Sequence, residues 1–362
     1  MKSPARIVLL LGGLALLTAV PEGASAQGSD EGALHVETLK REHPDMYDVL
    51  MRIERAHGVL FGQLALEGET LRGSGEDLPT FGFEFDMVER LSQLVQETGP
   101  ADDAAAEAAA GFGALGERAA AIIAWGNVFY REVMGILADP ELRTMPERRE
   151  ALAAALERYR SRPDVALPVE PKSMDILYEH DFHERFRTGY ADLDGVIWAG
   201  HWLKLAATEP LTDFPEWADR QAGLDTVTTR FYSKLSYGEP PQFFPSELPM
   251  APAIAPGLIF LSPETAMVWD NLTMLQEVLA DILVAFDATD VHAAIEDAVD
   301  HFMDPGYEVT DQGGWESMAL GHGIFFQGGY PLGVMTESEL NVGGHAAHLR
   351  AGGNITIPGM PG

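Results

Sequence analysis

The chain has 362 residues, of which 46% are hydrophobic, and is long enough to bury a large core without cross-links. It carries 24 Lys and Arg against 56 Asp and Glu, a formal net charge of −32, and has no cysteine. This charge argues against nucleic acid and anionic lipid as partners, because both are bound by clustered Lys and Arg. The absence of cysteine excludes disulfides, thiolate catalysis, thiolate-bound iron–sulfur clusters and c-type haem attachment.

Residues 1–26 have the pattern of a secretory signal peptide. Lys2 and Arg6 precede the apolar run IVLLLGGLALLTAV, and ASA at 24–26 is an A-x-A cleavage signal. The run is shorter than the roughly 20 residues that span a bilayer, and no later segment is long and apolar enough to do so. We therefore expect an exported chain without a transmembrane segment after cleavage. Its size and lack of cysteine favour a bacterial periplasmic or secreted protein.

Helical periodicity dominates the rest of the chain. Residues 27–44 are polar and are expected to form a loose leader, followed by a helical domain over 45–237. Within this domain the apolar spacing and the Gly and Pro punctuation predict helices at about 45–66, 85–97, 108–138, 147–160, 173–209 (with breaks at Gly189 and Gly195) and from about 215 to 238.

Residues 238–257 contain six prolines and are expected to form an extended, helix-free strap. A helical hairpin over 258–305, beginning at Ser262-Pro263, is predicted to pack on the same bundle. The region 306–362 is rich in glycine and is expected to be partly irregular. With no alternating strand pattern, the fold class is mainly α, a multi-helix bundle.

Glu54 and His57 lie on the first predicted helix of the domain. His57 falls within the apolar stripe beside Leu50 and Ile53, and Glu54 lies at its edge. Helical bundles use the Glu-x-x-His spacing to direct a carboxylate and an imidazole at one metal ion. The alternative is a core histidine whose ring nitrogens are satisfied by Glu54 or by a backbone carbonyl.

The sequence YEHDFHERFR at 178–187 holds two histidines among three carboxylates. On a helix, His180, His183 and Glu184 are neighbours at i, i+3 and i+4. However, His180 and Glu184 share one side, whereas His183 and Glu179 share another. A single ion would therefore take one pair and complete its site from another helix. The alternative is a solvated, charged helix face.

His201 follows in the sequence WAGHWLK. In one straight helix it would lie about 27 Å from His183, too far to share an ion. If 191–195 form a turn, the two halves fold back and His201 approaches His183, with Trp198 and Trp202 shielding the site from water. The alternative is a buried histidine in an aromatic cluster.

Two functions from different classes remain open. The first is an exported protein with a His/carboxylate metal centre between helices, its reaction unassigned, with the candidate ligands Glu54, His57, His180, His183, Glu184 and His201. Nitrogen and oxygen ligands without thiolate suit iron, manganese, zinc or copper. The second is a non-enzymatic binding or scaffold protein without a cofactor, whose histidines are structural and whose small-molecule or protein partner the sequence does not identify.

Overall fold

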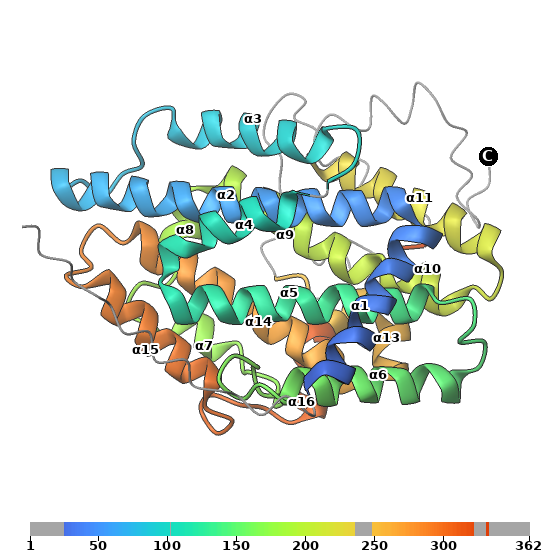
Figure 1. The fold of residues 1–362 in the computed structure, drawn as a ribbon. Coiled ribbons are helices and arrows are strands. Elements are labelled where there is room, and N and C mark those ends of the chain that lie inside the picture. The colour runs from blue at the N-terminus through green and yellow to red at the C-terminus, as the bar shows by residue number, and fades with distance from the viewer. Residues whose placement is uncertain (1–24, 102, 236–247, 322–330, 333–362) are drawn as a thin grey trace, which may run out of the picture.

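The computed structural model describes residues 25–101, 103–235, 248–321 and 331–332 as one helical bundle (Figure 1). The predicted mainly α class is confirmed: the described residues contain no strand, and their one element of β pairing is an isolated bridge between Lys172 and Val309. None of the helices in these ranges is long and apolar enough to cross a membrane.

Most residues in the described part of the chain belong to helices. In chain order they are α1 (Ser25–Glu42), α2 (Pro44–Ser74), α3 (Phe83–Gln96), α4 (Ala104–Phe112), the 3-10 turn η1 (Gly113–Leu115), α5 (Glu117–Ala138), α6 (Met145–Arg160), α7 (Asp175–Tyr178), α8 (Arg185–Gly189), α9 (Ala191–Ala206), α10 (Thr208–Asp213), α11 (Trp217–Leu235), α12 (Ala251–Ile254), α13 (Pro256–Leu261), α14 (Pro263–Val284), α15 (Val291–Met303) and α16 (Gln312–Gly321).

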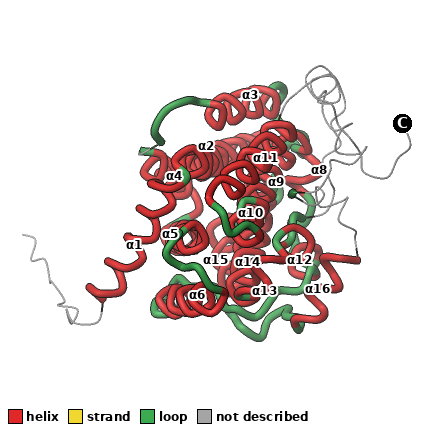
Figure 2. Tube along the Cα trace, turned by 90° about the vertical axis from the view of Figure 1, so that its right-hand side faces the viewer, coloured by secondary structure: helices red, strands yellow, loops and turns green. Residues whose placement is uncertain are grey.

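The centre of the bundle is α14, which lies among the other helices in the view along the bundle (Figure 2). All of its residues from Thr265 to Val284 are buried, because α2, α5, α8, α12, α13 and α15 pack around it. A helix buried on every side must also bury polar side chains, and these need hydrogen-bond partners in the interior. Its neighbours supply them, as described below.

Glycines bring the long helices unusually close together. A side chain at Gly58 of α2 would overlap the backbone of Ala108 in α4, and one at Gly68 would overlap the carbonyl of Leu283 in α14. Gly111 of α4 faces the backbone of Gly58 in turn. The contacts of α2 with α4 and α14 are therefore made backbone to backbone, and even a methyl group does not fit between them.

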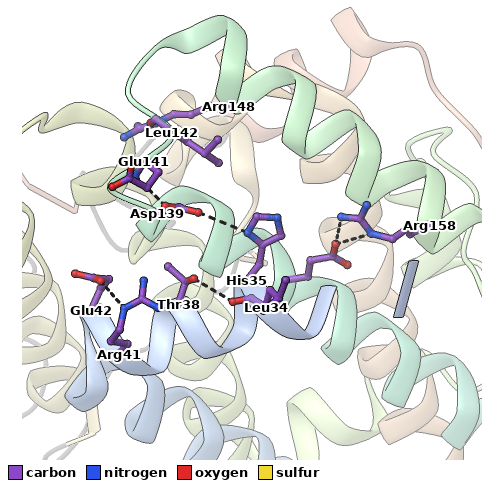
Figure 3. Close-up of polar contacts among 11 residues, drawn as sticks. Leu34, His35, Thr38, Arg41, Glu42, Asp139, Glu141, Leu142, Arg148 and Arg158 are labelled. Atoms are coloured by element: carbon purple, nitrogen blue, oxygen red, sulfur yellow. Dashed lines mark hydrogen bonds and ion pairs between the residues drawn. The ribbon is translucent and has the colours of Figure 1, made fainter. Parts of the chain in front are cut away.

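Residues 27–42 are not the loose leader that the sequence predicts. They belong to α1, which packs on α5, where the carbonyl of His35 occupies the space that a side chain at Gly135 would need. Figure 3 shows the His35 ring pointing toward Asp139 at the end of α5, with Nδ1 3.9 Å from Oδ2. The polar composition of this segment concealed a helix whose inner face needs little apolar surface.

Two further predictions are corrected. The helical stretch expected over 173–209, with breaks at Gly189 and Gly195, is divided among α7, a turn, α8, α9 and α10. The break at Gly189 is in place, whereas residues 191–195 form the start of α9. The strap is not helix-free: in its part that the structure describes, Pro252 and Pro256 occupy the first turns of α12 and α13. Proline fits there because the first turn of a helix needs no backbone donor. Residues 238–247 lie outside the described ranges.

Buried carboxylates from other helices cap the short helices α12 and α13. Asp270 of α14 accepts the amide of Ala251 at 3.1 Å, at the start of α12, and the indole N–H of Trp315 at 2.9 Å. Glu209 accepts the amide of Gly257 in α13 at 2.9 Å. These short helices are thus positioned by side chains that are distant in sequence, since their own sequences are too short to hold a helix.

The close approach at Gly58 predicts a strong position dependence for Gly→Ala substitution within α2. Gly58→Ala should lower the free energy of unfolding by about 3 kcal/mol, because the new methyl group meets backbone that cannot move aside. Gly73→Ala, on the same helix with no atom near its added methyl group, should raise it by about 0.5 to 1 kcal/mol. Urea unfolding of the two variants measures both values; equal effects at the two positions would refute the backbone contact.

Candidate functional site

The six residues singled out by the sequence lie in two separate places. His57 and His201 meet in the interior between α2 and α9, and Glu54 lies one turn before His57 on α2. His180, His183 and Glu184 lie in the turn between α7 and α8. The structure therefore brings His57 and His201 together and places His183 elsewhere, and the use of these residues as metal ligands stays a prediction.

The interior pair consists of His57 and His201, whose rings meet edge to face with their centres 5.0 Å apart. Both side chains are buried. Gly200 permits the contact, because a side chain there would come within 2.8 Å of His57 Nε2. Among the residues that the structure describes, neither ring nitrogen of His201 has a hydrogen-bond partner, nor does Nε2 of His57. Buried nitrogen atoms without a partner carry a free-energy cost and mark the place as unusual.

Three charged side chains border the pair. Glu54 forms an ion pair with Arg131 of α5, so its carboxylate is already engaged. Lys204, one turn after His201 on α9, donates from Nζ to Asn127 Oδ1 at 3.3 Å and lies 5.4 Å from the centre of the Tyr130 ring. The site therefore contains two positive side chains and one negative one.

Burial and these charges keep both imidazoles neutral. Burial lowers the pKa of His201 to about 3, and the positive charge of Lys204 lowers it further. The side chain of Gln276 acts in the opposite direction, although it does not form a hydrogen bond with the ring. Burial also holds the pKa of His57 well below its usual value. The pKa of Lys204 falls to about 8, because burial and Arg131 outweigh the attraction of Glu54.

No three His, Asp or Glu side chains among the described residues are arranged to hold a metal ion. His57 and His201 offer two neutral nitrogen ligands, but Glu54 is bound to Arg131 and the nearest remaining charge, on Lys204, is positive. A divalent cation would be repelled by that charge. Metal binding by this pair stays a prediction, and the electrostatics of the site oppose it.

The stretch YEHDFHERFR is not one helix: Tyr178 ends α7, residues 179–184 form a turn against α14, and α8 begins at Arg185. Asp281 accepts the amide of Phe186 at 2.6 Å through Oδ1 and the amide of Glu184 at 3.2 Å through Oδ2. It thereby caps α8, and Glu184 takes a left-handed conformation with φ of 61° where the chain enters that helix. A buried carboxylate from a distant helix decides the local structure, which the helical spacing of the histidines does not reveal.

The two histidines of the turn have different surroundings. His180 Nε2 lies 3.3 Å from Asp281 Oδ2, without hydrogen-bond geometry, and its Nδ1 accepts the amide of Phe182 at 3.4 Å. His183 is exposed, and its Nδ1 donates to the carbonyl of His180 at 3.2 Å. Glu184 is also exposed. His180 is thus a structural partner of Asp281, and His183 and Glu184 face solvent.

This turn forms one side of a groove of about 390 Å3, at the lower left of Figure 1 where α7 and α15 meet. Its floor is apolar and consists of Ile176, Phe182, Val278, Ile282, Ala298 and Phe302. Its polar residues are Asp175, Glu179, His180, Asp181, Thr289, Asp290, Asp297, His301, Tyr307 and Glu308. Of the described residues that line it, none is Lys or Arg, so the potential in the groove is negative.

Lys172 holds the far wall of the groove in place. Its ammonium donates to the carbonyls of His301, Asp304 and Tyr307 at 2.9, 2.7 and 2.7 Å, and its side chain is fully buried. The chain after α15 is also tied down, because Ser173 donates its amide to the carbonyl of Glu308 at 2.7 Å. These bonds satisfy the last carbonyls of α15 and give the groove a preformed wall.

A wider hollow of about 740 Å3 lies between α2, the connection from α3 to α4, and α11. Its charged residues are mixed: Arg52 faces Asp45, Asp48, Glu97 and Asp225 across it. Its lining also contains apolar residues, among them Met46, Val49 and Leu224. The groove at α7 and α15 combines a ligand-sized volume, apolar surface and one sign of charge, and is the better candidate for a binding site.

Comparisons with protein-family models, with curated proteins and with solved structures give no match. The function is therefore argued from the geometry of this chain alone.

The sequence pattern did not identify the residues that set the electrostatics of the His57/His201 pair and the walls of the groove at α7 and α15. Lys204 is one of five lysines in the chain and stands in WAGHWLKLA, an otherwise apolar helix, which is a signal that it is buried. Asp281 lies far from YEHDFHERFR in sequence, and its contact with that stretch is made only in the folded chain. Asp297 and His301 form an i,i+4 pair, a spacing that is common on helix surfaces and is only a weak signal of a site.

The low pKa of His201 predicts a loss of stability in acid. The unfolded chain protonates His201 near its ordinary pKa of 6.5, whereas the folded protein does so only near 3. Acidification through this range therefore favours unfolding. The difference in unfolding free energy between the native protein and His201→Gln should fall by about 1.4 kcal/mol for each pH unit below 6.5.

Urea unfolding at a series of pH values measures this difference. His183→Gln is the matched control, because His183 is exposed and should follow the native protein at every pH. A His201→Gln variant that loses stability in parallel with the native protein would contradict a neutral, buried His201.

Proposed function

We propose that this protein is an exported binding protein for a small organic cation, a molecule with an apolar body and a protonated or quaternary amine. The observation that carries the proposal is the groove at α7, α14 and α15, in which an apolar floor is bordered by carboxylates of one sign. The leader pattern of residues 1–26 supports export.

The volume and the lining support a small molecule. A groove of about 390 Å3 lies within the roughly 300 to 1,000 Å3 of typical ligand sites. Phe182, Val278, Ile282 and Phe302 offer contact to an apolar body, and removal of that surface from water supplies most of the binding free energy. The exposed carboxylates beside these residues then favour a ligand with a positive charge.

The carboxylates differ in how far they are available. Asp290 is used as the cap of α15, where it accepts the amide of Ala293 at 3.0 Å, and Asp175 accepts from the hydroxyl of Ser173 at 2.9 Å. Asp297 lies 3.8 Å from His301, whose ring stacks on Tyr307 with centres 3.9 Å apart. The carboxylate of Asp297 beside this aromatic pair is the most favourable position for an ammonium group, since a cation is attracted by both.

Phenethylamine and phenethyl alcohol form a matched pair of probes, because they share shape and apolar surface and differ in charge at pH 7. Isothermal titration should show the amine binding at least about tenfold more tightly than the alcohol, and this preference should shrink at high salt. Equal affinity for the two probes, or no binding of either, would refute the proposal.

Single-charge variants locate the site. Asp297→Asn and Glu179→Gln should each weaken the amine by up to about fivefold, the effect of one partly exposed ion pair, and should leave the alcohol unchanged. Glu150→Gln is the control, because Glu150 is an exposed carboxylate on α6, which contributes no residue to the groove. A loss of affinity in the control equal to that in the groove variants would show a general charge effect instead of a site.

A further inference from the structure

Lys172, which is fully buried, and Lys204, which is half-buried, differ in how their ammonium groups are hydrogen-bonded. The ammonium of Lys172 has three carbonyl acceptors within 2.9 Å. That of Lys204, among the residues that the structure describes, has one acceptor, Asn127 Oδ1 at 3.3 Å. An ammonium group has three N–H donors, so two of those on Lys204 lack a protein partner.

A small cavity lies against this ammonium. It has about 20 Å3 of space for the centre of a water-sized sphere, enough for one such particle. Its lining comes from α5, α9 and α14 and consists of Asn127, Tyr130, His201, Lys204, Leu205, Trp269, Leu272, Thr273 and Gln276. His201 lines it with both ring nitrogens unpartnered and only 2% of the residue exposed.

The charges around the cavity do not cancel. Glu54 and Arg131 neutralise one another in their ion pair, and His57 and His201 are neutral because burial lowers the pKa of both. The positive charge of Lys204 remains. A buried charge is costly unless an opposite charge accompanies it, and here the missing charge is negative.

We propose that the cavity between Lys204 and His201 binds a halide-sized anion, with chloride as the physiological occupant. Lys204 supplies the charge, and the N–H groups of His201 and of the Asn127 amide supply further donors. The size of the cavity admits a single-atom ion and excludes sulfate and phosphate. The site lies apart from the groove at α7 and α15 and does not depend on the function proposed for it.

This assignment also accounts for the histidine pattern that suggests a metal. Two neutral imidazoles resemble half of a metal site, but each also has one N–H donor. The ammonium beside them reverses the sign of the ion that the site favours. The chemistry of the place is thus decided by Lys204 and not by the histidines.

Bromide is the probe, because it resembles chloride and its anomalous scattering identifies it in a crystal. Crystals of the native protein grown in sodium bromide should show an anomalous peak about 3.2 to 3.5 Å from Lys204 Nζ and within reach of His201. If the electron density shows a peak in the cavity but the anomalous difference map shows none, the cavity holds a water molecule and the proposal is wrong. This measurement needs no variant and stays decisive if substitutions impair folding.

Solution measurements test the role of the charge. At constant ionic strength, replacement of gluconate by chloride should raise the Tm in a saturable way. Lys204→Met should abolish this response, whereas Lys40→Met, which removes a lysine from the surface of α1, should keep it. A chloride response that persists in Lys204→Met overturns the assignment.

Lys204 also predicts how binding depends on pH. The groups facing it are Glu54 and His57 of α2, Tyr130 and Arg131 of α5, and His201 of its own helix, while α14 presents the uncharged Thr273 and Gln276. The pKa of Lys204 is about 8, so this group loses its positive charge between pH 7 and 9. Chloride affinity should therefore fall by about tenfold across this range; Zn2+ or Cu2+ bound at His57 and His201, with no effect of chloride, would instead establish a metal site.

Discussion

The polar side chains of α14 constrain most of the structure around it, because a helix buried from Thr265 to Val284 cannot turn them toward water. Asp270 takes the amide of Ala251 and the indole of Trp315. Asn271 accepts the amide of Lys172 at 2.9 Å and donates to the carbonyls of Pro168 and Glu170. Asp281 caps α8 and faces His180. Segments more than a hundred residues apart are positioned by this one helix.

The candidate groove follows from that arrangement. Asp281 fixes the turn that carries Glu179 and Asp181, and Asn271 fixes Lys172, which in turn holds the end of α15. Both walls are therefore tied to α14, whose apolar residues form part of the floor. A site held from beneath by hydrogen bonds is preorganised, so little ordering is left to oppose ligand binding.

Local pattern predicted much of the fold but little of the site. The spacing of apolar residues predicts α2, α3, α6, α14 and α15 well, because burial of one face is a local property of the sequence. It fails at YEHDFHERFR, whose conformation depends on Asp281, ninety-odd positions away in the chain. For His57 and His201 the sequence pattern predicts burial but not the charge of the ion that they would bind. That charge depends on Lys204 and Arg131, whose positions next to the histidines are set only when the helices pack.

Native-state hydrogen exchange tests the central role of α14 most directly. The amides of Lys172, Glu184, Phe186 and Ala251 lie in loops or at the starts of short helices, yet each donates to a side chain of α14. They should exchange only through opening of the core, within about tenfold of the amides of α14 itself. The amide of Gly306 has an exposed local acceptor, Asp304, and should exchange far faster. If the four amides exchange as fast as that of Gly306, α14 does not organise the structure in the way described.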